Sequence, residues 1–231
     1  MRVHHTIRST LGSKVPQTTT GLIAVERYSQ KGSAMVVMSS LEKLFVNRFN
    51  ERISRNAFQV VSDALTLPQE SSVLELGAGR GALSHLLYEH YRPKRIAVTD
   101  YDPLQLKEAK LYFQKKLRSI PAGVEFRVAD ALNLPFEDES FDAAFAMLVL
   151  HHLENHQWQF RHIPRALDEI KRVLKQEGSF VFEEVFKKNE ITSHLEQNGF
   201  FRETSMKGSW WVSKFFVYRK TLAAQENNDS N

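Results

Sequence analysis

Hydrophobic residues first recur at helical spacing after a polar beginning. Residues 1 to about 34 are polar and predict a loosely ordered arm. Residues 39–66 then carry apolar side chains three or four positions apart, the period of a helix with one buried face. Pro68 marks the end of this segment. The pattern therefore predicts one or two helices before residue 68.

From residue 73 onward, short apolar runs alternate with segments of helical spacing. We expect strands at 73–76, 95–100, 124–130, 141–150 and 179–186. We expect helices at 82–91, 103–119, 163–178 and 190–200, and a short helix where the fourth strand ends. Gly178 and Gly199 are expected to end the last two long helices. Two further strand-like runs, around 200–206 and 210–219, lie too close together for a crossover helix, so they predict an antiparallel pair.

This alternation predicts an α/β fold, a three-layer Rossmann-like sandwich with helices on both faces of a mostly parallel sheet. The antiparallel pair is expected at one edge, which gives the sheet an antiparallel edge strand. The N-terminal helices add to this core. We divide the chain into an N-terminal arm with helices (1–68), a main domain (69–220) and a disordered tail (221–231).

Composition narrows the chemistry. The chain has 231 residues and no cysteine, which excludes disulfides, cysteine zinc sites and a thiol nucleophile; we predict no metal site. The net charge is +4, a mild excess that ordinary solubility explains. No apolar run reaches the roughly 18 residues that a membrane helix needs. The first residues lack the apolar core of a secretory signal, so we expect a cytoplasmic protein.

A glycine-rich loop is the strongest local signal. Glu75-Leu76-Gly77-Ala78-Gly79-Arg80-Gly81 joins the first strand of the sheet to its helix. Glycines there permit a sharp turn and a close ligand, and the helix start offers free amides. The spacing Gly77-x-Gly79-x-x-Ala82 also fits the dinucleotide pattern, with Asp100 placed to hold ribose hydroxyls. The loop alone therefore leaves two ligand classes open, nicotinamide dinucleotides and S-adenosylmethionine.

Three acidic residues favour the second class. Glu75, Asp100 and Asp130 end the first three strands of the predicted sheet. Carboxylates repel a pyrophosphate but attract an ammonium or a sulfonium group. An acid at the end of the third strand can also accept a hydrogen bond from an adenine amine. The site thus suits a zwitterionic nucleoside better than a dinucleotide.

Five segments then resemble the class I S-adenosylmethionine-dependent methyltransferases, and most closely the ubiquinone and menaquinone type. They are VLELGAGRG (73–81), TDYD (99–102), VADALNLPFEDESFD (128–142), AFAMLVLHHL (144–153) and EIKRVLKQEGSFVFEE (169–184). The resemblance covers about residues 70–186. Gln176 and Glu177 depart from the family's Pro-Gly, which changes a turn and not the site.

The resemblance implies a seven-stranded sheet with its last strand inserted antiparallel, and S-adenosylmethionine as cofactor with S-adenosylhomocysteine as product. It assigns the methionine portion to Glu75, Gly77, Ala78, Gly79 and Gly81. It assigns the ribose to Asp100, the neighbourhood of adenine to Tyr101, the adenine edge to Asp130 and Ala131, and the sulfonium to Ala146 and Met147. It makes residues 69–220 the cofactor-binding domain and residues 1–68 the substrate side.

Candidate catalytic residues follow the fourth strand. His151 and His152 come close to where the methyl group would point, and an imidazole titrates near neutral pH. Either is a candidate base or substrate contact; the alternative is that one of them caps or packs the short helix. Glu183 and Glu184 end the fifth strand and alternate in direction, so one of them is expected at the pocket mouth.

The acceptor is identified by elimination as a small organic molecule. The residues after the fourth strand are not the Asn-Pro-Pro-aromatic motif of amine methylation. His156, Arg161, His162 and Arg165 are candidates for binding an anionic acceptor, and Phe45, Phe49, Phe58 and Trp158 for an apolar pocket. Trp210, Trp211, Phe215 and Phe216, with Lys207, Lys214, Arg219 and Lys220, form an aromatic and basic stretch. Such a stretch is compatible with RNA stacking or a membrane interface, although alternation through a strand pair explains it too.

Three other functions stay open at this point. The first is methylation of RNA or protein, which the basic charge suggests. The second is a non-catalytic scaffold that only binds the cofactor. A nicotinamide oxidoreductase is the third, and the sequence does not indicate an oligomeric state. Fold similarity alone does not decide among them.

Overall fold

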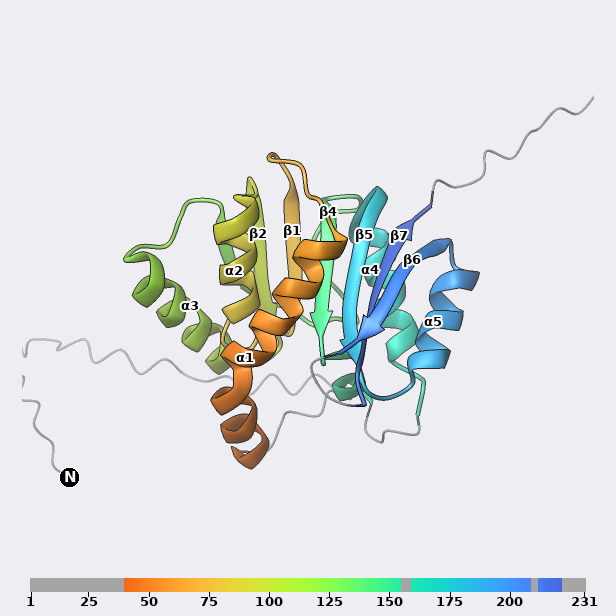
Figure 1. The fold of residues 1–231 in the computed structure, drawn as a ribbon, viewed down its shortest axis with the longest axis horizontal. Coiled ribbons are helices and arrows are strands. Elements are labelled where there is room, and N and C mark those ends of the chain that lie inside the picture. Colours follow the sequence, from red (N-terminus) through yellow and green to blue (C-terminus); the bar gives the residue numbers. More distant parts are fainter. Residues whose placement is uncertain (1–39, 155–158, 209–211, 222–231) are drawn as a thin grey trace, which may run out of the picture. The chain divides into compact units, whose positions relative to one another are not determined.

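A single seven-stranded sheet forms the centre of the structure (Figure 1). The computed structural model describes residues 40–154, 159–208 and 212–221, with side chains described from residue 51 onward. The strands are β1 (Ser72–Leu76), β2 (Arg95–Asp100), β3 (Val124–Val128), β4 (Phe141–Met147), β5 (Leu174–Glu184), β6 (Phe200–Lys207) and β7 (Lys214–Lys220). Their order is β3-β2-β1-β4-β5-β7-β6. The first five are parallel, and β7 runs antiparallel between β5 and β6, which confirms the predicted fold class.

Helices cover both faces of the sheet. They are α1 (Ser40–Ala64), α2 (Ala82–Tyr91), α3 (Pro103–Leu117), the short η1 (Leu150–Leu153), α4 (Ile163–Val173) and α5 (Lys188–Gln197). Figure 1 shows α1 and α2 in front of the sheet and α4 behind it. Two apolar clusters match these layers, one with residues of α1, α2 and α3 and the other with residues of η1, α4 and α5. The predicted N-terminal helix is a single helix, and its Ala57 and Val61 are fully buried in the front cluster.

The predicted end of the helix at 163–178 is wrong. The helix ends at Val173, and β5 begins at Leu174, whose backbone is extended (φ −77°, ψ 135°). The carbonyls of Arg172 and Val173 accept hydrogen bonds from the amides of Glu139 and Ser140, so they are committed outside the helix. Leu174 is fully buried. Tertiary contacts thus stop the helix before Gly178, which instead lies within β5, at the register irregularity between Leu174 and Ser179.

A buried carboxylate fixes the start of α4. One oxygen of Glu154 accepts hydrogen bonds from the amides of Arg161, His162 and Ile163, at 2.6, 2.7 and 3.1 Å. These are the orphan donors that every helix start leaves unpaired. Burial opposes the ionised form, but the three amide bonds outweigh it and hold the pKa of Glu154 below its usual range. The segment that follows β4 is thereby tied to the first turn of α4.

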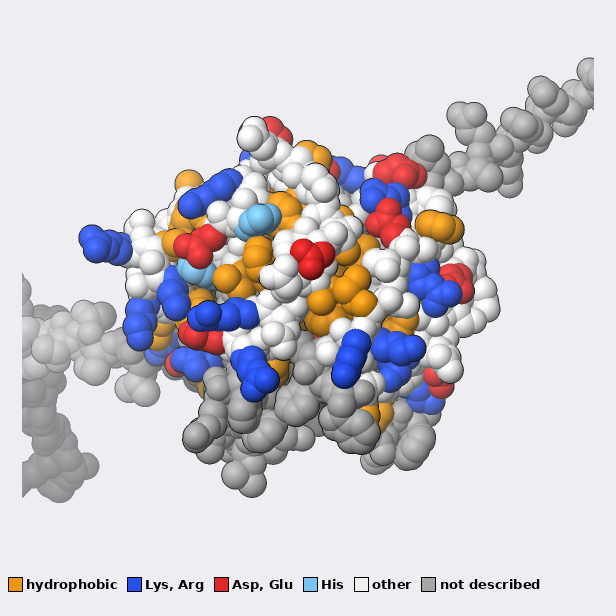
Figure 2. Space-filling model, in the orientation of Figure 1, with side chains coloured by type: hydrophobic (Ala, Val, Ile, Leu, Met, Phe, Trp, Pro, Cys, Tyr) orange, Lys and Arg blue, Asp and Glu red, His pale blue; other side chains and the backbone are white. Residues whose placement is uncertain are grey.

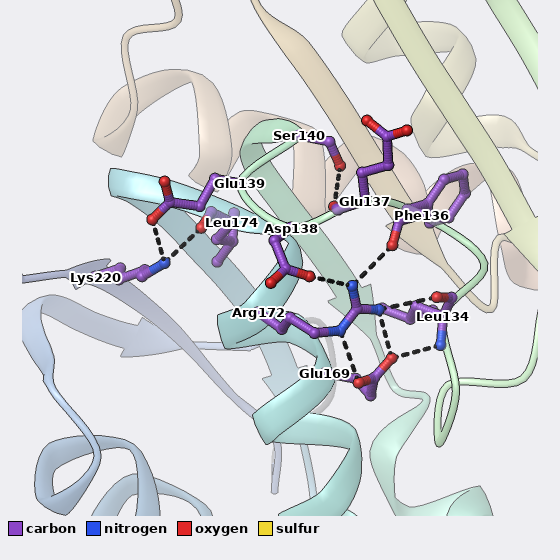
Figure 3. Close-up of polar contacts among 10 residues, drawn as sticks. All are labelled: Leu134, Phe136, Glu137, Asp138, Glu139, Ser140, Glu169, Arg172, Leu174 and Lys220. Atoms are coloured by element: carbon purple, nitrogen blue, oxygen red, sulfur yellow. Dashed lines mark hydrogen bonds and ion pairs between the residues drawn. The ribbon is translucent and has the colours of Figure 1, made fainter.

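Arg172 clamps α4 to the loop that follows β3 (Figure 3). Its guanidinium donates to the carbonyls of Leu134 and Phe136 and to the carboxylates of Glu169 and Asp138, at 2.7–2.9 Å. Glu169 also accepts from the amide of Leu134, at 2.7 Å. The bonds from Arg172 hold the pKa of Glu169 below its usual range. The loop after β3 contains Asp130, a candidate site residue. One side chain of α4, Arg172, therefore fixes the shape of this loop.

In the part of the chain that the structure describes, no helix is both long enough and apolar enough to cross a membrane.

Replacing Arg172 with methionine should lower the free energy of unfolding by about 2–4 kcal/mol, because two carbonyls and two carboxylates lose their donor together. Arg202→Met is the control, since Arg202 makes one exposed ion pair, at 3.5 Å, of a kind worth about 0–1 kcal/mol. Urea unfolding of both variants measures the difference. Equal losses would show that the clamp contributes no more than a surface pair.

Candidate functional site

The predicted site residues lie along one edge of the sheet. β1, β2, β4 and β5 are parallel, so their carboxyl ends meet at the same edge. The strand order reverses direction between β1 and β4, and ligands of open α/β sheets bind at such a switch point. The loop after β1, the end of β2 and the turn after β4 all reach this place.

The glycine loop adopts backbone conformations that disfavour side chains. Gly77, Gly79 and Gly81 have φ of 60°, 53° and 70°. A Cβ on Gly77 would also lie 2.5 Å from Cγ2 of Val149, in the turn after β4. A Cβ on Gly81 would lie 3.0 Å from Ala109 on α3. The loop therefore packs directly against two neighbouring elements, and side chains have no room there.

Asp100 holds the glycine loop in place. Its two carboxylate oxygens accept hydrogen bonds from the amide of Gly79, at 2.9 Å, and from the amide of Asp102, at 2.8 Å. The amide of Ala78 donates to the carbonyl of Thr99, and that of Gly81 to the carbonyl of Ala78, both at 2.8 Å. The end of β2 thus fixes the loop that follows β1.

These bonds bear on the choice between the two ligand classes. A pyrophosphate on a glycine loop is bound by the amides of that loop and of the helix start. Here the amides of Ala78, Gly79 and Gly81 already donate to groups of the protein. The arrangement is therefore unsuited to a pyrophosphate and leaves carboxylate oxygens as the acceptors that a ligand would meet.

Glu75 is a second, deeply buried carboxylate at this edge. It lies at the end of β1, is 4% exposed, and accepts a hydrogen bond from the Ser84 hydroxyl on α2. Burial raises the pKa of Glu75 to about 7, the hydrogen bonds from Ser84 oppose this rise, and the charge of Asp100 adds to it. A carboxyl group with such a pKa is costly to ionise alone, and a bound cation would offset that cost.

The other predicted cofactor contacts are near the same edge, and their roles stay predictions. Tyr101 and Met147 are half-buried at the ends of β2 and β4. Asp130 is half-buried after β3 and accepts a hydrogen bond from the amide of Leu132, at 2.9 Å. Ala131 beside it is buried. With Glu75 and Asp100, the set is rich in acceptors, which fits hydroxyl, amine and ammonium groups of a ligand.

His151 is held by a buried carboxylate. Its Nδ1 lies 2.6 Å from Oε1 of Glu184, and its amide donates to Oε2 of the same residue, at 3.1 Å. Glu184 is fully buried at the end of β5, whereas the His151 side chain is 19% exposed. The rings of His152 and Phe186 lie 4.1 and 5.7 Å away from the His151 ring, measured between centroids. An imidazole fixed by a carboxylate and open to solvent has the arrangement of a general base.

Glu183 and Glu184 point in opposite directions, as alternation along a strand requires. Glu183 is buried on the other face of the sheet and accepts a hydrogen bond from the Ser213 hydroxyl, at 2.6 Å. A Cβ on Gly208 would collide with both Ser213 and Glu183, so a glycine is needed there. The two side chains therefore lie on opposite faces of the sheet, and it is Glu184, not Glu183, that pairs with His151.

Several sequence candidates lie elsewhere or are otherwise engaged. Phe58 packs edge-to-face on His90, 5.2 Å between centroids, against the front cluster. The ring of His162 bonds to Glu154 at 3.2 Å, and Arg165 donates to a backbone carbonyl. Their side chains thus support the structure around α4. His156, Trp158, Trp210 and Trp211, and the side chains of Phe45 and Phe49, lie outside the described residues.

Two contributors were not predicted. Ser84 is the partner of Glu75, and Val149 packs on Gly77. A serine in the first turn of the helix that follows the glycine loop was a usable signal for the first, because that turn faces the end of β1. No local signal marks Val149, since its contact depends on the pairing of β1 with β4.

Comparison with known proteins gives consistent results. A family profile described as "Methyltransferase domain" matches residues 74–182. The phthiotriol/phenolphthiotriol dimycocerosates methyltransferase of Mycobacterium tuberculosis (strain ATCC 25177 / H37Ra) is 33% identical over 121 residues, 52% of this chain and 40% of that protein. The ubiquinone/menaquinone biosynthesis C-methyltransferase UbiE of Desulfotalea psychrophila is 29% identical over 114 residues, 49% of this chain and 41% of that protein. The chain thus spans about two-fifths of the length of these curated relatives.

Solved structures share the fold. A protein from Pyrococcus horikoshii OT3 superposes with a TM-score of 0.65 at 20% identity, covering 80% of this chain and 100% of that one. A SAM-dependent methyltransferase from Aquifex aeolicus gives 0.62 at 16% identity, covering 78% and 98%.

Replacing Gly77 with alanine should weaken binding of S-adenosylhomocysteine at least tenfold, because the added Cβ collides with Val149 and distorts the loop. Gly199→Ala is the matched control: its φ is +79°, but the nearest atom to its Cβ is 3.6 Å away and it lies beyond α5. Both variants should lose about 1 kcal/mol or more from backbone strain. Calorimetric titration with S-adenosylhomocysteine distinguishes the two variants. Equal affinity of both for this ligand would refute the role of the glycine loop in binding.

Glu75 should make stability depend on pH. Its pKa is raised in the folded protein to about 7, so its contribution is present below the unfolded value and is lost as pH rises through about 7. Going from pH 8 to pH 5, the wild type should gain about 2–3 kcal/mol relative to Glu75→Gln. Unfolding curves of both proteins without ligand, at the two pH values, measure this. Parallel pH profiles would contradict the assignment.

Proposed function

Because residues 74–182 of this chain belong to the class I S-adenosylmethionine-dependent methyltransferases, we propose that the protein transfers a methyl group from S-adenosylmethionine to a small-molecule acceptor. The names of two relatives support a small acceptor, one being a methyltransferase of phthiotriol and phenolphthiotriol dimycocerosates and the other a C-methyltransferase of ubiquinone/menaquinone biosynthesis. The observation that carries the proposal is the pairing of His151 with Glu184 next to the carboxylate-rich edge of β1 and β2.

The chain's own residues fit this cofactor. Glu75 would take the ammonium of its methionine portion, and Asp100 the ribose hydroxyls, while Asp130 and Ala131 would hold the adenine edge. The Gly77–Gly81 loop would lie along the methionine portion. Bound there, S-adenosylmethionine supplies a methyl group that is already activated by its sulfonium.

The main contribution of the protein to such a transfer is positioning. Alignment of a nucleophile with an activated group can supply up to about 7–11 kcal/mol of the barrier. The glycine loop, bonded to Asp100 and packed on Val149, is rigidly placed for that task. A dedicated base then matters for acceptors that must lose a proton, such as hydroxyls and acidic carbons.

We assign the base to His151. The carboxylate of Glu184 can only accept, so Nδ1 of His151 carries the proton and Nε2 keeps a lone pair. Nε2 is then the atom that takes a proton from the acceptor as its nucleophile attacks. The charge of Glu184 stabilises the imidazolium that results. Its bond to Nδ1 keeps the ring from turning, and the bond from the His151 amide holds the carboxylate in place. The ring of His152, predicted beside it, lies tilted at 42° to the His151 ring, and we assign it no proton transfer.

Replacing His151 with glutamine should reduce methyl transfer about 10²- to 10⁴-fold and leave binding of S-adenosylhomocysteine unchanged. The control is His194→Gln, because His194 also contacts a carboxylate, Asp168 at 3.2 Å, with a similar exposure of 21%, but between α4 and α5. Tritiated S-adenosylmethionine with a panel of phenols, quinols and hydroxylated lipids measures transfer. A tRNA pool and denatured cell protein test the alternative acceptors.

Three results would overturn the proposal. If S-adenosylhomocysteine does not bind, the assigned cofactor is refuted. If tritium is transferred only to RNA or protein, the small-molecule acceptor is refuted. If the two histidine variants are equally active, the assignment of His151 as the base is refuted.

A further inference from the structure

A row of charged side chains begins at the candidate base. Glu184 on β5 is the register partner of Lys214 on β7, which is the register partner of Lys207 on β6. Register partners point to the same face of a sheet and lie about 5 Å apart per strand. The row therefore runs from the carboxylate that holds His151 to two lysines, within roughly 10 Å and on one face.

The two lysines line a cavity. It has a volume of about 350 Å³ and is bounded by Ser205, Met206, Lys207, Val212, Ser213 and Lys214. A third lysine is close, since Nζ of Lys188 at the start of α5 donates to the carbonyl of Val212, at 2.6 Å. Among the described residues, the side chains that line the cavity include no carboxylate. Figure 2 shows the opposite face, covered by α1 and α2, where further Lys and Arg side chains lie near the lower end of β6.

Within the described part of the chain, neither Lys207 nor Lys214 forms an ion pair. Both are exposed, and the Glu184 carboxylate opposite Lys214 is bonded to His151. Like charges placed directly opposite on antiparallel strands destabilise the pair. At the other end of β7 the cations are compensated: Arg219 pairs with Glu203 at 2.6 Å, and Lys220 with Glu139 at 3.4 Å. The repulsion is thus confined to the end of the strand that adjoins His151.

Protection of the sheet edge does not account for both lysines. Lysine on an edge strand discourages pairing with other chains, which is a sufficient reason for Lys207 on β6. Lys214 lies on β7, which is covered by β5 on one side and β6 on the other. The edge argument therefore does not account for Lys214, whose exposed side chain is solvated.

We propose that Lys207 and Lys214 form an anion-binding subsite for the methyl acceptor. The acceptor would carry a carboxylate or a phosphate group about 5–10 Å from its nucleophilic atom, one or two strand spacings from Glu184. The anion satisfies both ammonium groups and relieves their repulsion, while the nucleophile reaches His151. This inference rests on the proposed function for the identity of the ligand as the acceptor, but its binding can be measured without turnover.

The test compares anionic and neutral ligands of one shape on the full chain. The probes are 4-hydroxybenzoate, phenyl phosphate and the neutral 4-hydroxybenzamide, titrated calorimetrically with and without saturating S-adenosylhomocysteine. The variant is Lys207→Met/Lys214→Met. The control is Lys107→Met/Lys110→Met, which removes the same charge from two exposed lysines on α3. Thermal unfolding of both variants shows that they fold.

We expect at least one anion to bind the wild type tenfold or more tightly than the amide does. The Lys207→Met/Lys214→Met variant should lose at least tenfold of that affinity, and the control less than twofold. Preference for one of the two anions identifies the acceptor's charged group as a carboxylate or a phosphate. The variant should also unfold at an equal or higher temperature, because a repulsion is removed.

Equal affinity for the anions and the amide, equal losses in the two variants, or no binding of either anion would each overturn the subsite. Failure of S-adenosylhomocysteine to bind the wild type would instead refute the proposed function. The titrations without that ligand still decide the subsite, so the two failures are distinguishable.

Discussion

The hydrogen bond between the Asp100 carboxylate and the amide of Gly79 determines what the rest of the site can bind. It occupies a donor that a phosphate would need and fixes the loop after β1 to the end of β2. With that donor committed, the ligand meets mostly acceptors, and Glu75 nearby is buried with a raised pKa. A site of this kind selects ligands that carry positively charged groups and hydroxyl donors. The choice of ligand class therefore follows from how the loop satisfies its own backbone.

The end of β5 lies between the proposed cofactor site and the proposed acceptor site. Glu184 uses both oxygens on His151, whereas Glu183 is bonded to Ser213 on the opposite face. The antiparallel insertion of β7 then extends the row from Glu184 to Lys214. The strand inserted between β5 and β6 thus brings positive charge close to His151, the proposed base. The antiparallel insertion at this edge would thereby contribute to the proposed site.

Much of this could be predicted from the sequence, because the signals are local. The alternation of apolar runs gave the strands, and glycines and acids at strand ends marked the edge where they meet. What could not be predicted depends on register between distant strands. The pairing of His151 with Glu184 needs β4 beside β5, and the row to Lys214 needs β7 in its inserted place. The early end of α4 likewise follows from carbonyls bonded to Glu139 and Ser140, which no local propensity reveals.

The contact between Gly77 and Val149 has a mechanical consequence. Val149 is two residues before His151 in the chain, and its methyl groups lie where any side chain on Gly77 would be. The loop that would carry the methyl donor and the turn that carries His151, the proposed base, therefore touch through close-packed carbon. A displacement of either loop must move the other. This packing contact sets the spacing at which donor and base would work.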